Sequence, residues 1–200
     1  SAGEMLLGML VGLVNTYLVG HLGAASLTAV GIGVQVSMAA MVLFSAVGTG
    51  ATAVTARMVG AEDVKGANRV VAQSVLIAFL CGVVSSLGLF IFAEPAMVIM
   101  GATGESLTQG VVYLRIICIV FPVSSMIFVG GACLRGAGDT RTPLLVMAVV
   151  NVLNIVVAWV LVKGIGLFPT LGVAGAAYGS ALSRFLGGLI VFALLLRGRS

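Results

Sequence analysis

Residues 5–56 form one uninterrupted stretch without Asp, Glu, Lys or Arg, and this stretch constrains the fold more than any other feature of the sequence. A helix that crosses the hydrocarbon core of a bilayer needs about 20 apolar residues. The stretch is therefore long enough for two such helices, joined near His21, which Gly20 and Gly23 flank. Over the whole chain only 8% of residues are charged, whereas a soluble domain carries about 25%. We therefore expect a protein whose surface faces membrane lipid.

The remaining stretches of low charge divide the chain into further candidate helices. Transmembrane β-strands alternate apolar and polar residues, whereas runs such as 144–150 are continuously apolar. Helices also satisfy their backbone hydrogen bonds internally, as the lipid core requires. We predict an all-α membrane protein with one transmembrane domain over 1–200 and a kink at Pro122, which lacks a backbone donor. The six expected helices cover 5–20, 26–56, 70–93, 107–134, 142–162 and 172–196.

The basic residues are distributed unevenly between the predicted loops. If the first helix starts at the cytoplasmic side, only Lys163 lies in an outer loop, while Arg115 and Arg184 fall within helices. Because cytoplasmic loops are rich in Lys and Arg, this distribution predicts a multi-pass inner-membrane protein with both ends in the cytoplasm. The net charge of +4 therefore reflects topology, and we expect no nucleic-acid partner. The residues expected on the cytoplasmic side are Arg57, Lys65, Arg69, Arg135, Arg141, Arg197 and Arg199.

The sequence offers little for enzymatic or metal chemistry. Its only histidine, His21, lies at a predicted turn, and no pair of acids falls at membrane depth. Cys81, Cys118 and Cys133 lie in apolar stretches without the spacing of metal ligands, so we expect buried free thiols. We therefore expect a protein that is not an enzyme and that has no cofactor and no certain metal site.

Polar side chains inside the predicted helices are the candidate binding residues, because such side chains are costly in lipid. A common inward cluster would present carbonyl and hydroxyl oxygens to a hard cation or to the polar groups of a ligand. The alternative is that each amide only links two helices, through a bond worth about 0.6 kcal/mol on average. The residues of this predicted cluster are Asn15, Gln35, Asn154 and Ser180.

Three further polar residues are candidates for binding. Asn151 lies one helical turn before Asn154. Arg184 falls near the centre of the last predicted helix and should face the protein interior, where carbonyls, an anion or another lobe could pair with it. Glu4 could carry a proton if its helix starts upstream, and otherwise lies at the interface. An adaptable apolar cavity, or else simple packing against protein or lipid, is predicted for Met38, Met41, Phe44 and Tyr178.

The segment 134–143 predicts the end of one helix and the start of another. Gly136 and Gly138 can end a helix in left-handed geometry. Thr142 is predicted to cap the following helix, with Pro143 in its first position and Asp139 close to its positive end.

The segment 131–143 resembles the loop after the fourth helix of the multidrug and toxic compound extrusion (MATE) transporters. Further segments match that family in the same order, and together they cover almost the whole chain. The resemblance implies the N-terminal six-helix lobe of a twelve-helix, two-lobe transporter. Because the first apolar stretch is short, we expect the sequence to start partway into a helix. The other matching segments are 12–23, 53–61, 113–116, 151–154 and 171–177.

The resemblance also implies a function and a coupling ion. Members of the family export organic, often cationic, compounds through cation-coupled antiport, so the implied partners are membrane lipid, a small organic substrate and a second six-helix lobe. Many members have a Na⁺- or proton-binding aspartate at the position of Asn15 and a second aspartate at that of Ala158. Both carboxylates are missing here. Only a weak sodium site at Asn15, Asn154 and Ser180 is expected, and a coupling acid would lie in the other lobe.

Two other functions are compatible with the sequence. A lipid-linked oligosaccharide flippase of related fold would place several cationic residues in its cavity, whereas Arg184 is the only central one here. A half-size subunit that acts as a homodimer would supply the second lobe from another copy of the same chain.

Overall fold

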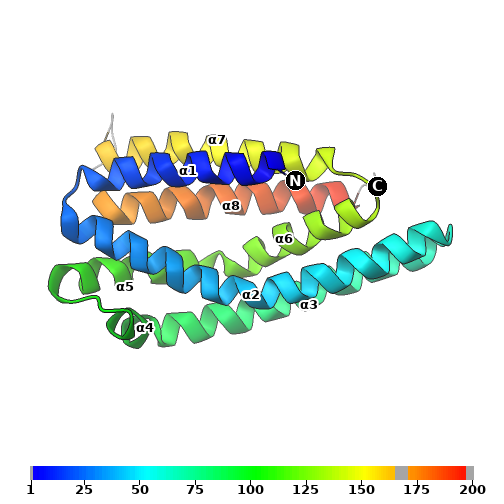
Figure 1. Ribbon diagram of the computed structural model, residues 1–200, viewed down its shortest axis with the longest axis horizontal. Coiled ribbons are helices and arrows are strands. Elements are labelled where there is room, and N and C mark those ends of the chain that lie inside the picture. Colours follow the sequence, from blue (N-terminus) through cyan, green and yellow to red (C-terminus); the bar gives the residue numbers. More distant parts are fainter. Residues whose placement is uncertain (1, 165–170, 197–200) are drawn as a thin grey trace.

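The chain is described here from a computed structural model over residues 2–164 and 171–196 (Figure 1). Glu4 lies in the first helix, but its side chain is outside the described part, as are Arg197 and Arg199. Within these ranges the protein consists of helices without strands, which confirms the all-α prediction. The helices are α1 (Ala2–Gly20), α2 (Ala24–Gly60), α3 (Val64–Ile91), α4 (Ala93–Ile99), α5 (Gly104–Ile119), α6 (Phe121–Gly136), α7 (Arg141–Lys163) and α8 (Gly172–Leu196).

Four of these helices, α2, α3, α7 and α8, are long and apolar enough to cross a membrane. A fifth candidate span is the bent pair of α5 and α6, and the apolar part of α1, Leu6–Gly20, is shorter. Large apolar side chains cover their outer faces: Met38, for example, is 63% exposed and Val84 is 70% exposed. A surface of this kind suits lipid rather than water, and the protein is a multi-pass membrane protein.

The bend between α5 and α6 lies where the proline in the sequence predicts a kink. The helix stops at Ile119 and resumes at Phe121, and the axes of the two parts differ by 55°. Pro122 stands in the first turn of α6, where its missing N–H leaves no hydrogen bond unmade. Gly82 of α3 fits against this bend, since a Cβ on it would lie 2.6 Å from the Pro122 Cα.

The short helix α4 is an element that the sequence analysis did not predict. The expected third helix, 70–93, stops in the structure at Ile91, and Ala93–Ile99 follows as a separate helix. Pro95 stands in the first turn of α4, where backbone N–H groups have no partner within the helix in any case. Proline there ends one helix and permits another to start, which explains the additional element.

The predicted cap of α7 is wrong by two residues. The structure starts α7 at Arg141 with Thr140 as its N-cap, so neither Thr142 nor Pro143 holds its predicted position. Asp139 supplies the cap instead: its Oδ1 accepts hydrogen bonds from the backbone N–H groups of Arg141 and Thr142, both at 3.0 Å. A hydrogen bond with the Thr142 side chain above all, and then the backbone bonds, lower the pKa of the Asp139 carboxyl.

The helices form two groups that diverge toward one end of the molecule (Figure 1). In one group α1, α7 and α8 run side by side, and in the other α2 lies along α3, while α6 packs on α2 and α3 and runs between the two groups toward the end of α8. The diverging end carries the α2–α3 turn, the α6–α7 loop, the start of α1 and the end of α8. The α1–α2 turn and the C-terminal end of α7 lie at the opposite end.

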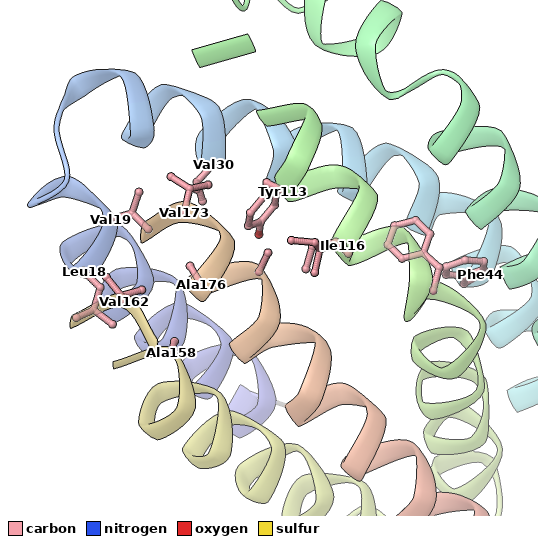
Figure 2. Close-up of a cluster of buried hydrophobic side chains, with 13 residues drawn as sticks. Leu18, Val19, Val30, Phe44, Tyr113, Ile116, Ala158, Val162, Val173 and Ala176 are labelled. Atoms are coloured by element: carbon pink, nitrogen blue, oxygen red, sulfur yellow. The ribbon is translucent and has the colours of Figure 1, made fainter. Parts of the chain in front are cut away.

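The main buried core lies near the end where the two groups converge (Figure 2). Tyr113 of α5 stands between α2 and α8 in this core. Each large apolar side chain that is fully buried in such a core contributes about 1.5–3 kcal/mol in water; in lipid, close contact replaces much of that term. Phe44 extends this core along α2 and meets the Phe121 ring edge to face, with 6.0 Å between ring centroids.

Candidate functional site

Three of the polar residues predicted to cluster do meet, and they come from three helices. Nδ2 of Asn15, on α1, donates a hydrogen bond to Oδ1 of Asn154, on α7, at 3.1 Å. Nδ2 of Asn154 then donates to Oγ of Ser180, on α8, at 2.9 Å. Asn154 and Ser180 are buried, with 6% and 7% exposed. We call Asn15, Asn154 and Ser180 the amide cluster.

The amide cluster has spare acceptor capacity. Oδ1 of Asn15 is buried and has no hydrogen-bond partner in the described structure. A buried oxygen without a partner is uncommon in a folded protein and costs about 1–3 kcal/mol. The free oxygen could therefore accept a hydrogen bond from a ligand or coordinate a hard cation together with the Ser180 hydroxyl.

The amide cluster lacks a charged ligand, and the packing of α7 on α8 explains part of this. Ala158 follows Asn154 by one turn and is completely buried. Gly179 of α8 packs on it so closely that a Cβ on Gly179 would lie 2.8 Å from the Ala158 Cα. A carboxylate side chain at residue 158 has no room unless α8 moves away. Among the described residues, no three His, Cys, Asp or Glu side chains gather to hold a metal ion.

Gln35 does not join the amide cluster. Its side chain is exposed on α2, whereas Gly33 on the same helix is buried against Tyr113. Two residues along a helix differ by about 200° in direction, so Gln35 points away from the core that Gly33 faces. The residues around Gln35 show no helical periodicity in the sequence, so the sequence alone does not indicate which side of α2 faces the core.

A cavity of about 210 Å³ lies between α2, α6, α7 and α8. We call it the α6–α8 cavity. It approaches the end of the molecule where the two helix groups diverge, because Leu134 and Pro143 border it there. It extends inward to Asn151, which precedes Asn154 of the amide cluster by one helical turn. The full lining is Met41, Ser124, Ile127, Phe128, Gly131, Leu134, Arg135, Pro143, Val146, Met147, Val150, Asn151, Arg184 and Val191.

The cavity contains some of the residues that the sequence analysis singled out and omits others. Arg184, Asn151 and Met41 line it. Phe44 is instead fully buried in the core. Two other side chains predicted to line a cavity are largely exposed on the surface: Met38, at 63%, and Tyr178, at 49%.

Several cavity-lining residues could not be identified from the sequence pattern. Ser124 lies in the first turn after the bend, two residues after Pro122, and the bend directs this part of α6 along the cavity. Ile127 and Phe128 are ordinary apolar residues in an apolar helix, so their composition carries no signal of a cavity.

The helical bundle, its apolar outer surface and a cavity that holds a few polar side chains are typical of multi-pass membrane transporters. The MatE family model matches residues 1–160. The chain therefore belongs to the MatE family of membrane transporters.

Individual relatives agree with this membership. The chain is 33% identical, over 98% of its length, to the probable multidrug resistance protein NorM of Thermotoga maritima, and it covers 42% of that protein. It is 30% identical over 86% of its length to an FAD transporter of Shewanella oneidensis, of which it covers 38%.

A solved structure gives the same result for the fold. It is described as the outward-facing conformation of a multidrug resistance MATE family transporter of the MOP superfamily. The TM-score is 0.90 at 30% identity, over 99% of this chain and 43% of that one. The chain thus spans about two fifths of the length of these relatives, and its fold corresponds to one lobe of a two-lobe transporter.

Proposed function

We propose that the protein is a secondary active transporter that exports small organic compounds across the cytoplasmic membrane. The chain would supply one six-helix lobe, and a second lobe, from the same polypeptide or from another copy, would complete the transport path. The observation that carries this proposal is the position of the α6–α8 cavity directly beside the amide cluster, on adjacent turns of α7.

The mechanism follows from this adjacency. Transporters of this kind bind substrate near the middle of the membrane and move one lobe against the other around that site. A ligand in the cavity would touch Asn151, while an ion or a ligand group at the amide cluster would touch Asn154 on the next turn. Occupancy of either site can then bias the packing of α7 against α1 and α8, and coupling requires such a shared element.

The coupling ion would be Na⁺ or a proton. Amide and hydroxyl groups do not titrate near neutral pH, so the amide cluster by itself cannot carry the proton. It could hold Na⁺ weakly through neutral oxygens. Proton coupling would need an acid outside the described side chains, in the second lobe or at Glu4.

The proposed orientation places both ends of the chain in the cytoplasm. The α2–α3 turn and the α6–α7 loop lie at the same end of the molecule (Figure 1), and the adjoining helix ends carry Arg57, Lys65 and Arg141. Lys163, at the end of α7, lies at the opposite end. This separation agrees with the enrichment of basic residues on the cytoplasmic side.

Export can be tested with the protein at its native length in proteoliposomes. An imposed Na⁺ or proton gradient should accelerate the release of ethidium, a flat organic cation, or of 1-naphthoate, a flat organic anion. Liposomes without protein and the Asn154→Ala variant serve as controls. If neither compound moves faster under either gradient, although the inserted protein is correctly folded, the proposal is wrong.

A further inference from the structure

The polar side chains of the α6–α8 cavity include several hydrogen-bond donors. The Arg184 guanidinium carries five N–H donors and no acceptor, and Arg135 also lines the cavity. None of the described lining residues is an Asp or a Glu. In the described structure no acidic side chain pairs with Arg184. Arg184 therefore brings a positive charge to a cavity whose described lining holds no acid.

Two further groups in the cavity are buried and lack partners. Nδ2 of Asn151 and Oγ of Ser124 have no hydrogen-bond partner in the described structure. The two residues are only 9% and 7% exposed, and both line the same cavity as Arg184. Because buried polar groups in folded proteins are almost always paired, these atoms are unused hydrogen-bonding capacity at the residues that line the cavity.

The rest of the lining is apolar and adaptable. Met41, Met147, Ile127 and Phe128 border the polar groups. Methionine thioethers adapt to ligands of different shape, and an aromatic ring can stack on a flat apolar ligand. A ligand that satisfies the whole cavity would therefore combine an apolar ring system with one acceptor group.

We propose that the α6–α8 cavity binds organic anions or zwitterions through a carboxylate held by Arg184, with Asn151 and Ser124 as further donors. An arginine fork binds a planar carboxylate through two parallel hydrogen bonds. The carboxylate accepts the N–H groups of Arg184 and Asn151 and the hydroxyl of Ser124, and the ring system lies among Met41, Met147 and Phe128. This inference rests on the proposed transport function and names its substrate class. It differs from the organic cations expected from the family resemblance, because the described lining contains no acid to attract a cation.

Equilibrium dialysis of the protein at its native length, in phosphatidylcholine nanodiscs, tests the inference with three ligands that share one ring. These ligands are 1-naphthoate, 1-naphthamide and 1-naphthylmethylammonium, and binding to empty nanodiscs is subtracted. We expect 1-naphthoate to bind at least tenfold more tightly than either of the others. Equal affinities, or a preference for the ammonium compound, would overturn the proposal.

Two cavity variants test whether the named groups cause the preference. Arg184→Met keeps an unbranched side chain but removes the charge, and we expect it to lose at least tenfold in affinity for 1-naphthoate. Asn151→Asp preserves the shape and places a carboxylate in the cavity, so it should also abolish the preference. The matched control is Arg115→Met, because Arg115 lies over the Phe90 ring, 5.5 Å from its centroid, and outside the cavity. If either cavity variant still prefers 1-naphthoate as the wild type does, the proposal is wrong.

A lipid phosphate is the other oxyanion that could meet Arg184 in a membrane. Replacing part of the phosphatidylcholine by phosphatidylglycerol separates the two sources. We expect 1-naphthoate affinity to change less than threefold, whereas complete competition would show a lipid site and overturn the inference.

Ethidium export provides a separate readout of the proposed function. Export without a preference for carboxylate refutes only the inference, whereas carboxylate-selective binding by a protein that exports neither ethidium nor 1-naphthoate refutes the proposed function.

Discussion

Asn15 donates its amide to Asn154 at 3.1 Å and so connects α1 to α7 through two side chains that are distant in the sequence. Asn154 passes the connection on to Ser180 of α8 through its own amide. Asn154 is therefore the residue that holds three helices at one point, and it does so one turn from the α6–α8 cavity. A change in the packing of these helices and a change in ligand binding should affect each other through this residue.

Asn154→Ala should reduce transport more than it reduces stability. The substitution removes two interhelical hydrogen bonds, each worth about 0.6 kcal/mol in a membrane protein, so the loss of stability should remain near 1 kcal/mol. We expect drug or organic-anion export to fall at least fivefold at unchanged membrane expression, as measured by efflux and immunoblotting. Gln35→Ala is the matched control, because it removes an amide that is exposed on α2. Export that equals wild type would mean that Asn154 only links helices.

Asn15→Asp should create a stronger cation site in the amide cluster. The substitution keeps the shape of the side chain and replaces a neutral oxygen without a partner by a carboxylate oxygen. The carboxylate replaces the Nδ2 that donates to Asn154, so the Asn154 amide must turn to donate to it while its Oδ1 accepts the Ser180 hydroxyl, and a bound Na⁺ would neutralise the charge. We expect Na⁺ to raise the melting temperature of the purified variant by several degrees, and that of the wild type by less. A Na⁺ response no larger than that of the wild type would contradict a cation site at this position.

The sequence predicts the helical membrane fold well because its signal is cumulative. Long stretches without charge exclude a soluble surface, and the proline at residue 122 marks the bend. The juxtaposition of Asn15, Asn154 and Ser180 was also expected, since each is a costly polar group in an apolar helix. Their binding role remains a prediction.

It is harder to predict which way a side chain points from its helix and which helices come into close contact. Gln35 and Asn15 have similar sequence surroundings, but only Asn15 faces a partner. The buried position of Phe44 depends on Phe121, 77 positions away and on the far side of a bend. Ser124 lines the cavity only because that bend redirects α6. Such relationships are tertiary, and periodicity in one helix cannot predict them.

Gly179→Ala should disturb the packing of α7 on α8. A Cβ at this position would lie 2.8 Å from the Ala158 backbone, and the helices must separate to relieve the overlap. Overpacking of this kind costs about 1–3 kcal/mol, so we expect a clear drop in melting temperature. Gly31→Ala is the matched control, because a Cβ at Gly31 meets nothing within 4 Å. Alanine is favoured over glycine inside a helix by about 1 kcal/mol, so this control should be neutral or stabilising. Equal effects of the two substitutions would contradict the close packing.

Asp139 should stabilise α7 in a manner that depends on pH. A hydrogen bond with the Thr142 side chain above all, and two backbone N–H groups at the start of the helix, lower the pKa of its carboxyl in the folded protein. In the unfolded chain an Asp carboxyl has a pKa of about 3.9. A carboxyl whose pKa is lower in the folded protein stabilises the fold at every pH above that unfolded value. This stabilisation is lost as the pH falls through the lower, folded-state pKa. Asp139→Ala should therefore cost about 1 kcal/mol at pH 7, as loss of a capping residue does. The difference in stability between wild type and variant should shrink as the pH falls below about 4. Thermal unfolding in detergent at pH 7 and pH 3 measures it, and a difference that stays constant over this range would show that the carboxylate charge is not the source of the stabilisation.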